Sequence, residues 1–160
     1  MKTKIDFVKL VAAIIMCSLA GAVGSIFTIS AIQTWYTALN KPSFAPPNWV
    51  FGPAWTTLYI LMGISLYIVW EKGIKKKEIR SAVKVFGVQL GLNAVWSFLF
   101  FGLRSPFYGL IGIVLLWLAI VWTMIKFWKI SKTATYLLVP YILWVSFATI
   151  LNLAVWQLNP

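Results

Sequence analysis

Five long apolar runs dominate this 160-residue sequence. Each is interrupted by few or no charges and is long enough for a helix that crosses a bilayer, which needs about 20 mostly apolar residues. A transmembrane β-barrel would instead show segments of roughly ten residues with alternating polarity. The sequence therefore predicts an all-α fold, an integral membrane bundle of five transmembrane helices, in a single domain over residues 1–160. The expected spans cover residues 7–28, 49–70, 81–101, 107–128 and 134–156.

The first apolar run has a second interpretation, a cleaved signal peptide. Lys2, Lys4 and Lys9 lie at its start, and the Ala-Gly-Ala sequence at 20–22 is similar to a signal-peptidase site. Cleavage there would leave four spans. Apolar residues continue beyond this site to Ile29, and the whole run has the length of a membrane helix. We therefore expect the first span to be retained.

The net charge of +11 follows the topology of five spans. Basic residues of short loops concentrate on the cytoplasmic side of a membrane, which predicts a cytoplasmic amino terminus and a carboxyl terminus outside. No nucleic-acid partner is needed to explain the charge, although the segment 72–84 also suits anionic lipid headgroups. The outer side would hold only Lys41 and Arg104, and the cytoplasmic side Lys2, Lys4, Lys9, Lys72, Lys75, Lys76, Lys77, Arg80, Lys84, Lys126, Lys129 and Lys132.

Residue types that carry most enzymatic chemistry are scarce. The chain has no histidine, one cysteine (Cys17) and three acidic residues, Asp6, Glu71 and Glu78, near the cytoplasmic ends of spans. A metal site needs several such ligands, and proton-coupled transport usually keeps an ionisable group inside the bilayer. We therefore expect no metal site, no disulfide within the chain, no proton-coupled pump and no conventional acid–base hydrolysis.

Three helix faces combine tryptophan with small or polar residues well inside the spans. Residues about one turn apart share a face, and we expect these faces to meet in one cavity that opens outward. The alternative is a helix interface, with asparagines bonded between spans and tryptophans filling gaps. Gly63 would leave room beside the rings, and Pro140 would bend the fifth helix. The faces hold Trp55, Tyr59 and Gly63; Asn93, Trp96 and Ser97; and Trp144, Ala148 and Asn152.

The first connection is rich in proline. Pro42, Pro46, Pro47 and Pro53 disfavour helix at their own positions and at the residues before them. Aromatic side chains in the same stretch provide apolar surface for laying it across helix ends. We expect residues 30–48 to form a semi-rigid lid on the outer side, above the expected cavity.

Three stretches together resemble the translocator protein family (TspO/MBR), also called tryptophan-rich sensory proteins or peripheral-type benzodiazepine receptors, in its bacterial type. They are WYTALNKPSFAPPNWVFGPAWTTLYILMG from Trp35, LNAVWSFLFFG from Leu92 and VPYILWVSFATILNLAVWQLN from Val139. The resemblance covers the lid and most of three helices, and it is weak over the first and fourth spans. It implies a five-helix protein, commonly dimeric, in a bacterial cell membrane.

The resemblance also implies one pocket beneath the first loop for porphyrins and drug-like aromatic ligands. Indole faces suit a flat hydrophobic macrocycle, and the lack of histidine favours a metal-free porphyrin such as protoporphyrin IX over haem. Asn152 would add a polar contact. Lys41 and Arg104 would meet the propionates or, as the alternative, extend to the membrane interface without contacting a ligand. No cofactor is required, since the porphyrin is ligand or substrate. The matching pocket positions are Tyr36, Pro47, Trp55, Tyr59, Asn93, Trp96, Trp144 and Ala148.

Three functions remain open at this stage. The first is a receptor or carrier that senses or transports tetrapyrroles. The second is a light- and oxygen-dependent porphyrin-degrading enzyme, in which the resemblance implicates Trp55 and Trp144. The third is a packing scaffold or passive transporter that binds no porphyrin.

The resemblance raises two further partners, a sterol and a second copy of the chain. The cholesterol motif of animal members places a basic residue after a tyrosine late in the fifth helix, and none follows Tyr141 here. A reversed pattern, Lys132, Tyr136 and Leu138, carries little weight, and we predict no sterol partner. Gly87 and Gly91 form a GxxxG motif suited to a homodimer, or equally to internal packing.

Overall fold

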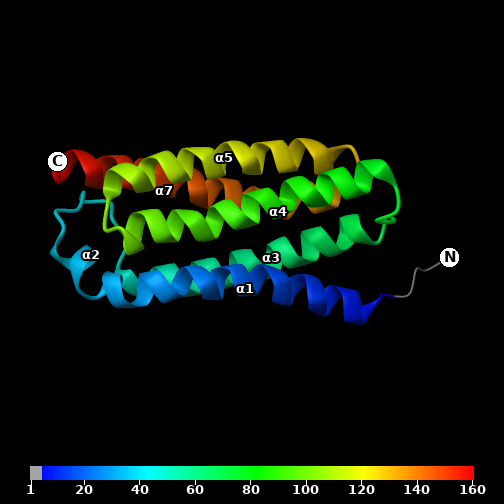
Figure 1. Cartoon of the computed structure of the whole chain (residues 1–160), viewed down its shortest axis with the longest axis horizontal. Coiled ribbons are helices and arrows are strands. Elements are labelled where there is room, and N and C mark those ends of the chain that lie inside the picture. The colour runs from blue at the N-terminus through cyan, green and yellow to red at the C-terminus, as the bar shows by residue number, and fades with distance from the viewer. Residues whose placement is uncertain (1–4) are drawn as a thin grey trace.

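The structure, a computed structural model, describes residues 5–160 as a bundle of long helices lying side by side (Figure 1). Five helical segments are long and apolar enough to cross a membrane, and the described residues contain no strand. The expected all-α bundle of five spans is confirmed. The elements are α1 (Phe7–Ile32), α2 (Trp35–Ala38), η1 (Asn48–Val50), α3 (Phe51–Trp70), α4 (Lys77–Ser97), η2 (Phe98–Gly102), α5 (Pro106–Trp128), α6 (Lys132–Tyr136) and α7 (Val139–Leu158).

Two helices extend several residues beyond the apolar runs from which they were predicted. The first ends at Ile32 rather than Thr28, and the third begins at Lys77 rather than Ser81. The added turn of α4 contains lysine, glutamate and arginine, which are good helix formers. Hydropathy marks the part of a helix that suits lipid, whereas the helix itself continues into the interface.

The fifth span is built from two helices instead of one bent helix. Ser131 caps α6 by accepting a hydrogen bond from the Ala134 amide, and α6 ends at Tyr136. Pro140 then lies in the first turn of α7, where its missing amide hydrogen costs nothing. The expectation that Pro140 bends a continuous helix is therefore wrong, because Pro140 lies at the start of α7.

Gly63 brings α1 and α3 into close contact. A Cβ atom at this position would lie 2.5 Å from the Cα atom of Ile14. The glycine accommodates the backbone of α1, and it does not make room beside Trp55 and Tyr59 as the sequence suggested. The two helices are therefore in direct contact at the level of Gly63.

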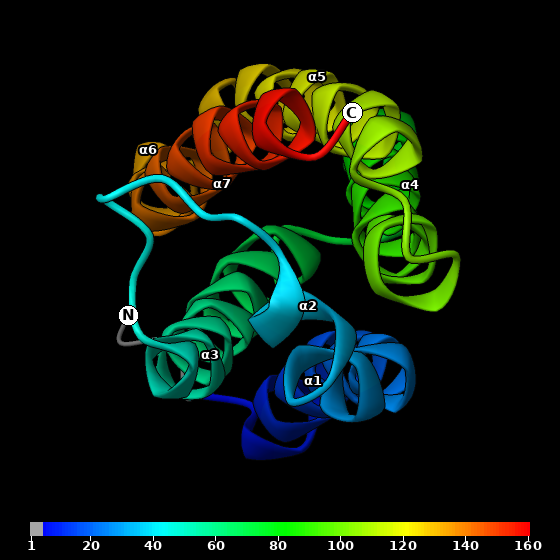
Figure 2. The same ribbon diagram turned by 90° about the vertical axis from the view of Figure 1, so that its left-hand side faces the viewer.

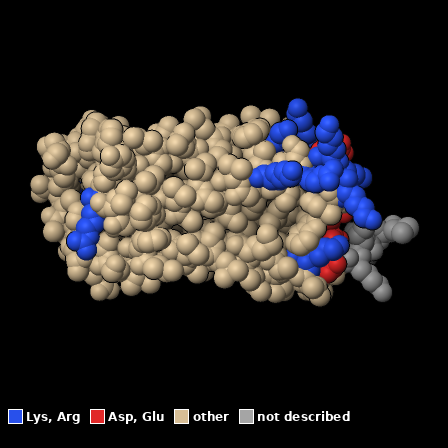
Figure 3. Space-filling view, viewed as in Figure 1, with Lys and Arg blue, Asp and Glu red and all other residues tan. Residues whose placement is uncertain are grey.

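Charge is concentrated at one end of the bundle (Figure 3). There Asp6 caps α1, with its carboxylate 3.1 Å from the Lys9 amide nitrogen, and this hydrogen bond lowers the pKa of Asp6. The Lys9 ammonium lies 2.7 Å from the Glu71 carboxylate just after α3. Basic residues of the helix ends and loops at this end are Lys9, Lys72, Lys75, Lys76, Lys77, Arg80, Lys84, Lys126, Lys129 and Lys132; Lys2 and Lys4 lie outside the described residues.

The first connection crosses the opposite end of the bundle. Figure 2 shows it leaving α1, passing through the short helix α2, approaching α7 and returning to α3. Residues 39–47 are not helical, as the prolines predicted, but Trp35–Ala38 form a helical turn inside the expected lid. Phe44 of this lid packs edge-on against Phe147 of α7, with ring centroids 6.4 Å apart.

Candidate functional site

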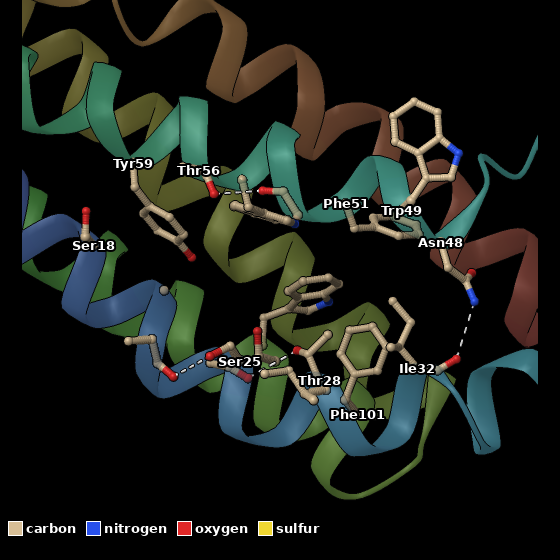
Figure 4. Close-up of a pocket in the computed structure, with 18 residues that line it drawn as sticks. Ser18, Ser25, Thr28, Ile32, Asn48, Trp49, Phe51, Thr56, Tyr59 and Phe101 are labelled. Atoms are coloured by element: carbon tan, nitrogen blue, oxygen red, sulfur yellow. Dashed lines mark hydrogen bonds between the residues drawn. The ribbon is translucent and has the colours of Figure 1, made fainter.

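A cavity of about 600 Å³ lies between α1, α3 and the end of α4, in the half of the bundle nearest the lid (Figure 4). Its α4 side is buried, whereas Ala22 of α1 and Thr56 of α3 are exposed on its rim. The cavity therefore reaches from the bundle interior to the outer surface between α1 and α3. That surface faces lipid in a membrane-spanning bundle.

The α1 wall consists mostly of small and hydroxyl-bearing residues, with two isoleucines at the end nearest the lid. Its members are Ser18, Gly21, Ala22, Gly24, Ser25, Thr28, Ile29 and Ile32. A Cβ atom at Gly21 would collide with the ring of Tyr59, and one at Gly24 would lie 2.9 Å from the Ser97 hydroxyl. Ser25 and Thr28 donate to carbonyls of their own helix, leaving little side-chain bulk in the cavity. Sequence reasoning missed this wall. Its signal was present in the small residues that resembled a cleavage site.

The facing wall is aromatic. Trp55 stacks on Tyr59 of the same helix with ring centroids 5.7 Å apart, and it lies 6.1 Å from Trp96 of α4. All three rings line the cavity, so the structure brings three predicted site residues together. Flat rings on one side and mostly small residues on the other make a slot suited to a planar apolar molecule.

The turn that ends α4 adds two more rings. η2 is a π-helix, in which the Leu103 amide donates to the Phe98 carbonyl at 2.8 Å. Such wide turns interrupt the ordinary helical spacing, and here both Phe100 and Phe101 are buried. Phe100 stacks on Trp96 with centroids 5.8 Å apart, and Phe101 lines the cavity. A regular helix would point adjacent residues about 100° apart, so this pair was not predictable from periodicity.

The two predicted asparagines hold helices together. Asn93 accepts a hydrogen bond from the Tyr59 hydroxyl at 2.5 Å and donates to the Tyr141 hydroxyl at 3.0 Å, which itself donates to Gln89 at 2.9 Å. Neither Asn93 nor Asn152 lines the cavity. The arrangement of both amides matches the helix-interface interpretation.

Asn152 makes the second of these interhelical contacts. It accepts from the Trp96 indole nitrogen at 3.4 Å and donates to the Pro106 carbonyl at 2.7 Å. The side chain of Asn152 on α7 thus orients the Trp96 indole, which lines the cavity. Asn152 itself lies outside the cavity. Trp117 of α5 also donates to α7, at 2.8 Å to the Ser146 hydroxyl.

A second group of predicted residues lies outside the cavity. Tyr36 and Trp144 both pack edge-on against Phe51, with ring centroids 6.1 and 6.2 Å from it, and Phe51 lines the cavity. Ala148 is buried one turn beyond Trp144, and Pro47 is exposed before η1. Phe51 therefore stands between the open cavity and a closed cluster around Tyr36 and Trp144.

Two polar atoms of this closed cluster have no partner. The Tyr36 hydroxyl and the Trp144 indole nitrogen are buried and unbonded among the described residues. Burial raises the pKa of Tyr36 to about 12, so its hydroxyl stays protonated and can donate. A buried donor left without an acceptor costs about 1–3 kcal/mol, which makes both atoms natural points of attachment for an acceptor on a ligand.

The two outer basic residues differ in their availability. The Lys41 ammonium donates to the carbonyls of Tyr36, Thr37 and Leu39 at 3.0 to 3.2 Å and lies 5.1 Å from the Tyr36 ring centroid. Arg104 is exposed at the turn before α5, in a left-handed conformation with φ 53°, and bonds no other described residue through its side chain. Neither lines the cavity.

Within residues 5–160, no group of three histidine, cysteine, aspartate or glutamate residues is placed to hold a metal. Cys17 is buried and unpaired in α1. The side chains around the cavity provide aromatic surface, hydroxyls and indole nitrogens. What this arrangement can do is bind an apolar molecule and orient it by stacking and a few hydrogen bonds.

Fold and cavity together define an integral membrane protein of five spans with an aromatic, lidded site. The sequence model of the TspO/MBR family matches residues 13–157, and the chain belongs to that family. It is 49% identical over 155 residues to "Tryptophan-rich protein TspO" of Archaeoglobus fulgidus, covering 96% of this chain and 99% of the relative. Identity to the protein of the same description from Chlorobaculum tepidum is 50% over 145 residues, 91% and 92% of the two chains. The human "Translocator protein" is 39% identical over 144 residues, 89% and 85% of the two chains.

Proposed function

We propose that the protein is a membrane receptor or carrier for porphyrins, protoporphyrin IX in particular, and for similar flat aromatic molecules. The observation that carries the proposal is the slot between the Trp55, Tyr59 and Trp96 rings and the small-residue wall of α1. Its volume of about 600 Å³ lies within the usual range for small-molecule sites. In this proposal the protein needs no cofactor of its own and takes part in tetrapyrrole sensing or transport.

Access from the bilayer is part of the proposal. The cavity reaches the surface between α1 and α3, and porphyrins partition into membranes because of their apolar rings. A ligand arriving sideways would meet the aromatic wall first. The lid would then close the outer end, where it already contacts α7 through Phe44 and Phe147.

The closed cluster extends the proposed site. A ligand edge that displaces Phe51 would gain the Tyr36 hydroxyl and the Trp144 indole nitrogen as donors, both of them unbonded in the structure. Pro47 and Ala148 would shape this part, and Asn93 and Asn152 would hold the rings from behind. Arg104 is free to meet a propionate, whereas Lys41 would first have to release carbonyls of the lid.

The test is a titration of the purified protein in nanodiscs with protoporphyrin IX, followed by intrinsic tryptophan fluorescence after inner-filter correction. Trp55→Ala and Trp96→Ala should each weaken binding about 5- to 150-fold, because stacking on an aromatic side chain contributes about 1–3 kcal/mol per ring. Trp122→Ala, on the exposed face of α5, is the matched control. Unchanged wild-type fluorescence over the titration would support the scaffold or passive-transport alternative.

A second candidate function is photo-oxidative degradation of the bound porphyrin. It is favoured by the position of Trp55, which lines the cavity and lies within 5.7 to 6.3 Å of the rings of Tyr59, Trp96 and Tyr141, where it would contact an excited ligand. Trp144 would act only after Phe51 moves. Product spectra in light and dark, with Trp55→Phe and Trp144→Phe, separate this activity from binding, since loss of turnover with retained affinity is expected only for an enzyme.

The proposed orientation and assembly rest on surface features. Ten basic residues of helix ends and loops share the end opposite the lid, which supports a cytoplasmic amino terminus in a bacterial cell membrane. Gly87 and Gly91 face open space on α4, which supports a homodimer through this face. Labelling of single cysteines in whole cells tests the first, and cross-linking of Val88→Cys across copies tests the second.

A further inference from the structure

A second hollow, of about 510 Å³, lies at the basic end between α5 and the α6–α7 segment. This hollow is remote from the lid. It shares no lining residue with the first cavity, the one beneath the lid. Its floor and sides are almost entirely apolar, and Lys129 stands at its edge. The lining residues are Val121, Met124, Ile125, Trp128, Lys129, Thr135 and Ile142.

The groove opens on the membrane-facing surface of the bundle. Its own Ile125 is exposed, as are Trp122 of α5 and Leu143 of α7 beside it. In a bilayer such a surface contacts hydrocarbon rather than water. The occupant that suits an apolar groove at this depth is therefore a lipid acyl chain.

The mouth of the groove carries uncompensated positive charge. Lys129 is exposed, and the Lys132 ammonium lies 5.3 Å from the Trp128 ring centroid. The two ion pairs of the described residues both involve Lys9, at the start of α1. Lys126, the other lysine nearby, turns toward α4, with 3.4 Å between its ammonium and the Ser81 hydroxyl. Two cations thus remain at the groove without a carboxylate.

Aromatic rings frame the same mouth. Trp128 and Tyr136 pack edge to face with centroids 5.7 Å apart, and both are exposed. Such rings settle at the level of lipid headgroups. The apolar groove, the rings and the lysines therefore follow one another in the order of a phospholipid's chain, glycerol and phosphate.

We propose that this groove binds one anionic phospholipid, with an acyl chain between α5 and α7 and the headgroup phosphate between Lys129 and Lys132. A net negative headgroup is specified because two lysines without acidic neighbours repel the added cation of a zwitterionic headgroup. The site is independent of porphyrin binding. It also gives Lys132 and Tyr136 of the reversed pattern a role that involves no sterol.

The experiment is native mass spectrometry of the detergent-purified protein titrated with phosphatidylglycerol or phosphatidylcholine. We expect a retained adduct of one phosphatidylglycerol, bound at least tenfold more tightly than phosphatidylcholine. Lys129→Gln and Lys132→Gln should each weaken it about fivefold, and the pair roughly 25-fold, since each cation near a headgroup contributes about 1 kcal/mol. Val121→Phe should weaken both lipids equally by filling the groove.

The matched control is the double variant Lys75→Gln and Lys76→Gln, which removes the same charge from the loop between α3 and α4. It should leave the affinity for phosphatidylglycerol unchanged. An equal loss in this control would assign the binding to diffuse surface charge and overturn the site. Equal affinity for the two phospholipids, or displacement of phosphatidylglycerol by cholesterol at lower concentration, would overturn it as well. Unchanged thermal unfolding by circular dichroism verifies that the variants fold.

Discussion

Asn159, just beyond α7, bonds Asn40 of the lid in both directions. Its side-chain oxygen accepts from the Asn40 amide at 3.0 Å, and its side-chain nitrogen donates to the Asn40 carbonyl at 2.9 Å. The same nitrogen lies 2.8 Å from the Val155 carbonyl of α7. One amide therefore joins the lid to the last helix, across 119 residues of sequence.

We predict that Asn159→Ala loosens the lid without unfolding the bundle. A hydrogen bond contributes about 1 kcal/mol net, so hydrogen exchange of the Asn40 amide should accelerate about fivefold. Porphyrin should dissociate faster in the same variant. Gln157→Ala, an exposed neighbour on α7, is the control. Unaltered exchange at Asn40 would mean that proline stiffness alone holds the lid.

Gly21→Val should block the cavity. A side chain there enters the space of the Tyr59 ring, so we expect at least a tenfold loss of protoporphyrin IX affinity in a fluorescence titration. Gly91→Val makes the same change in helix propensity, but position 91 on α4 faces open space. This variant should bind protoporphyrin IX like the wild type. Equal affinity of the two variants would move the ligand away from the α1 wall.

Gly63→Ala should destabilise the protein because the new methyl group meets backbone, which cannot rotate away. A Cβ atom would lie 2.5 Å from Ile14 Cα, and overpacking of this kind costs about 1–3 kcal/mol. Thermal unfolding in detergent measures the loss. Gly87→Ala, where nothing lies within 4 Å, should be neutral or slightly stabilising because alanine favours helix. A neutral Gly63→Ala would show that α1 is free to shift.

Asn93→Leu distinguishes a packing role from a ligand contact. The substitution leaves the Tyr59 hydroxyl without its acceptor and the Tyr141 hydroxyl without one donor, which should cost about 1–3 kcal/mol of unfolding free energy. Because Asn93 does not line the cavity, porphyrin affinity of the folded protein should change less than threefold. A larger loss of affinity at unchanged stability would make Asn93 a ligand contact.

The sequence predicted the bundle well because hydropathy and span length depend on each residue's own character. The five spans, the proline-stiffened lid and the aromatic face of Trp55 and Tyr59 required only local pattern. The shared face of Asn93, Trp96 and Ser97 on α4 likewise indicated that Trp96 points into the bundle. These features depend on the local composition and spacing of residues, which can be read from one sequence without knowing which helices pack together.

Other parts of the site depend on which helices become neighbours. The α1 wall escaped notice because glycine and serine carry no chemical signature until an aromatic helix lies opposite. The burial of both Phe100 and Phe101 required a π-helical turn that no spacing rule specifies. The contacts of Trp144 and Tyr36 with Phe51 depend on how the lid packs against α7. The cavity was therefore expected between α3, α4 and α7, whereas α1 replaces α7 as its wall.

The α1 wall consists mostly of small residues, and α1 is the least buried of the five spans. A larger residue on this wall reduces the volume of the slot, and at Gly21 or Gly24 it also presses on Tyr59 or Ser97. The size of the ligand that fits is thus determined mainly by residues of α1, whereas the strength of its binding is determined mainly by the aromatic rings of α3 and α4. Selectivity and affinity can diverge separately in proteins built on this plan.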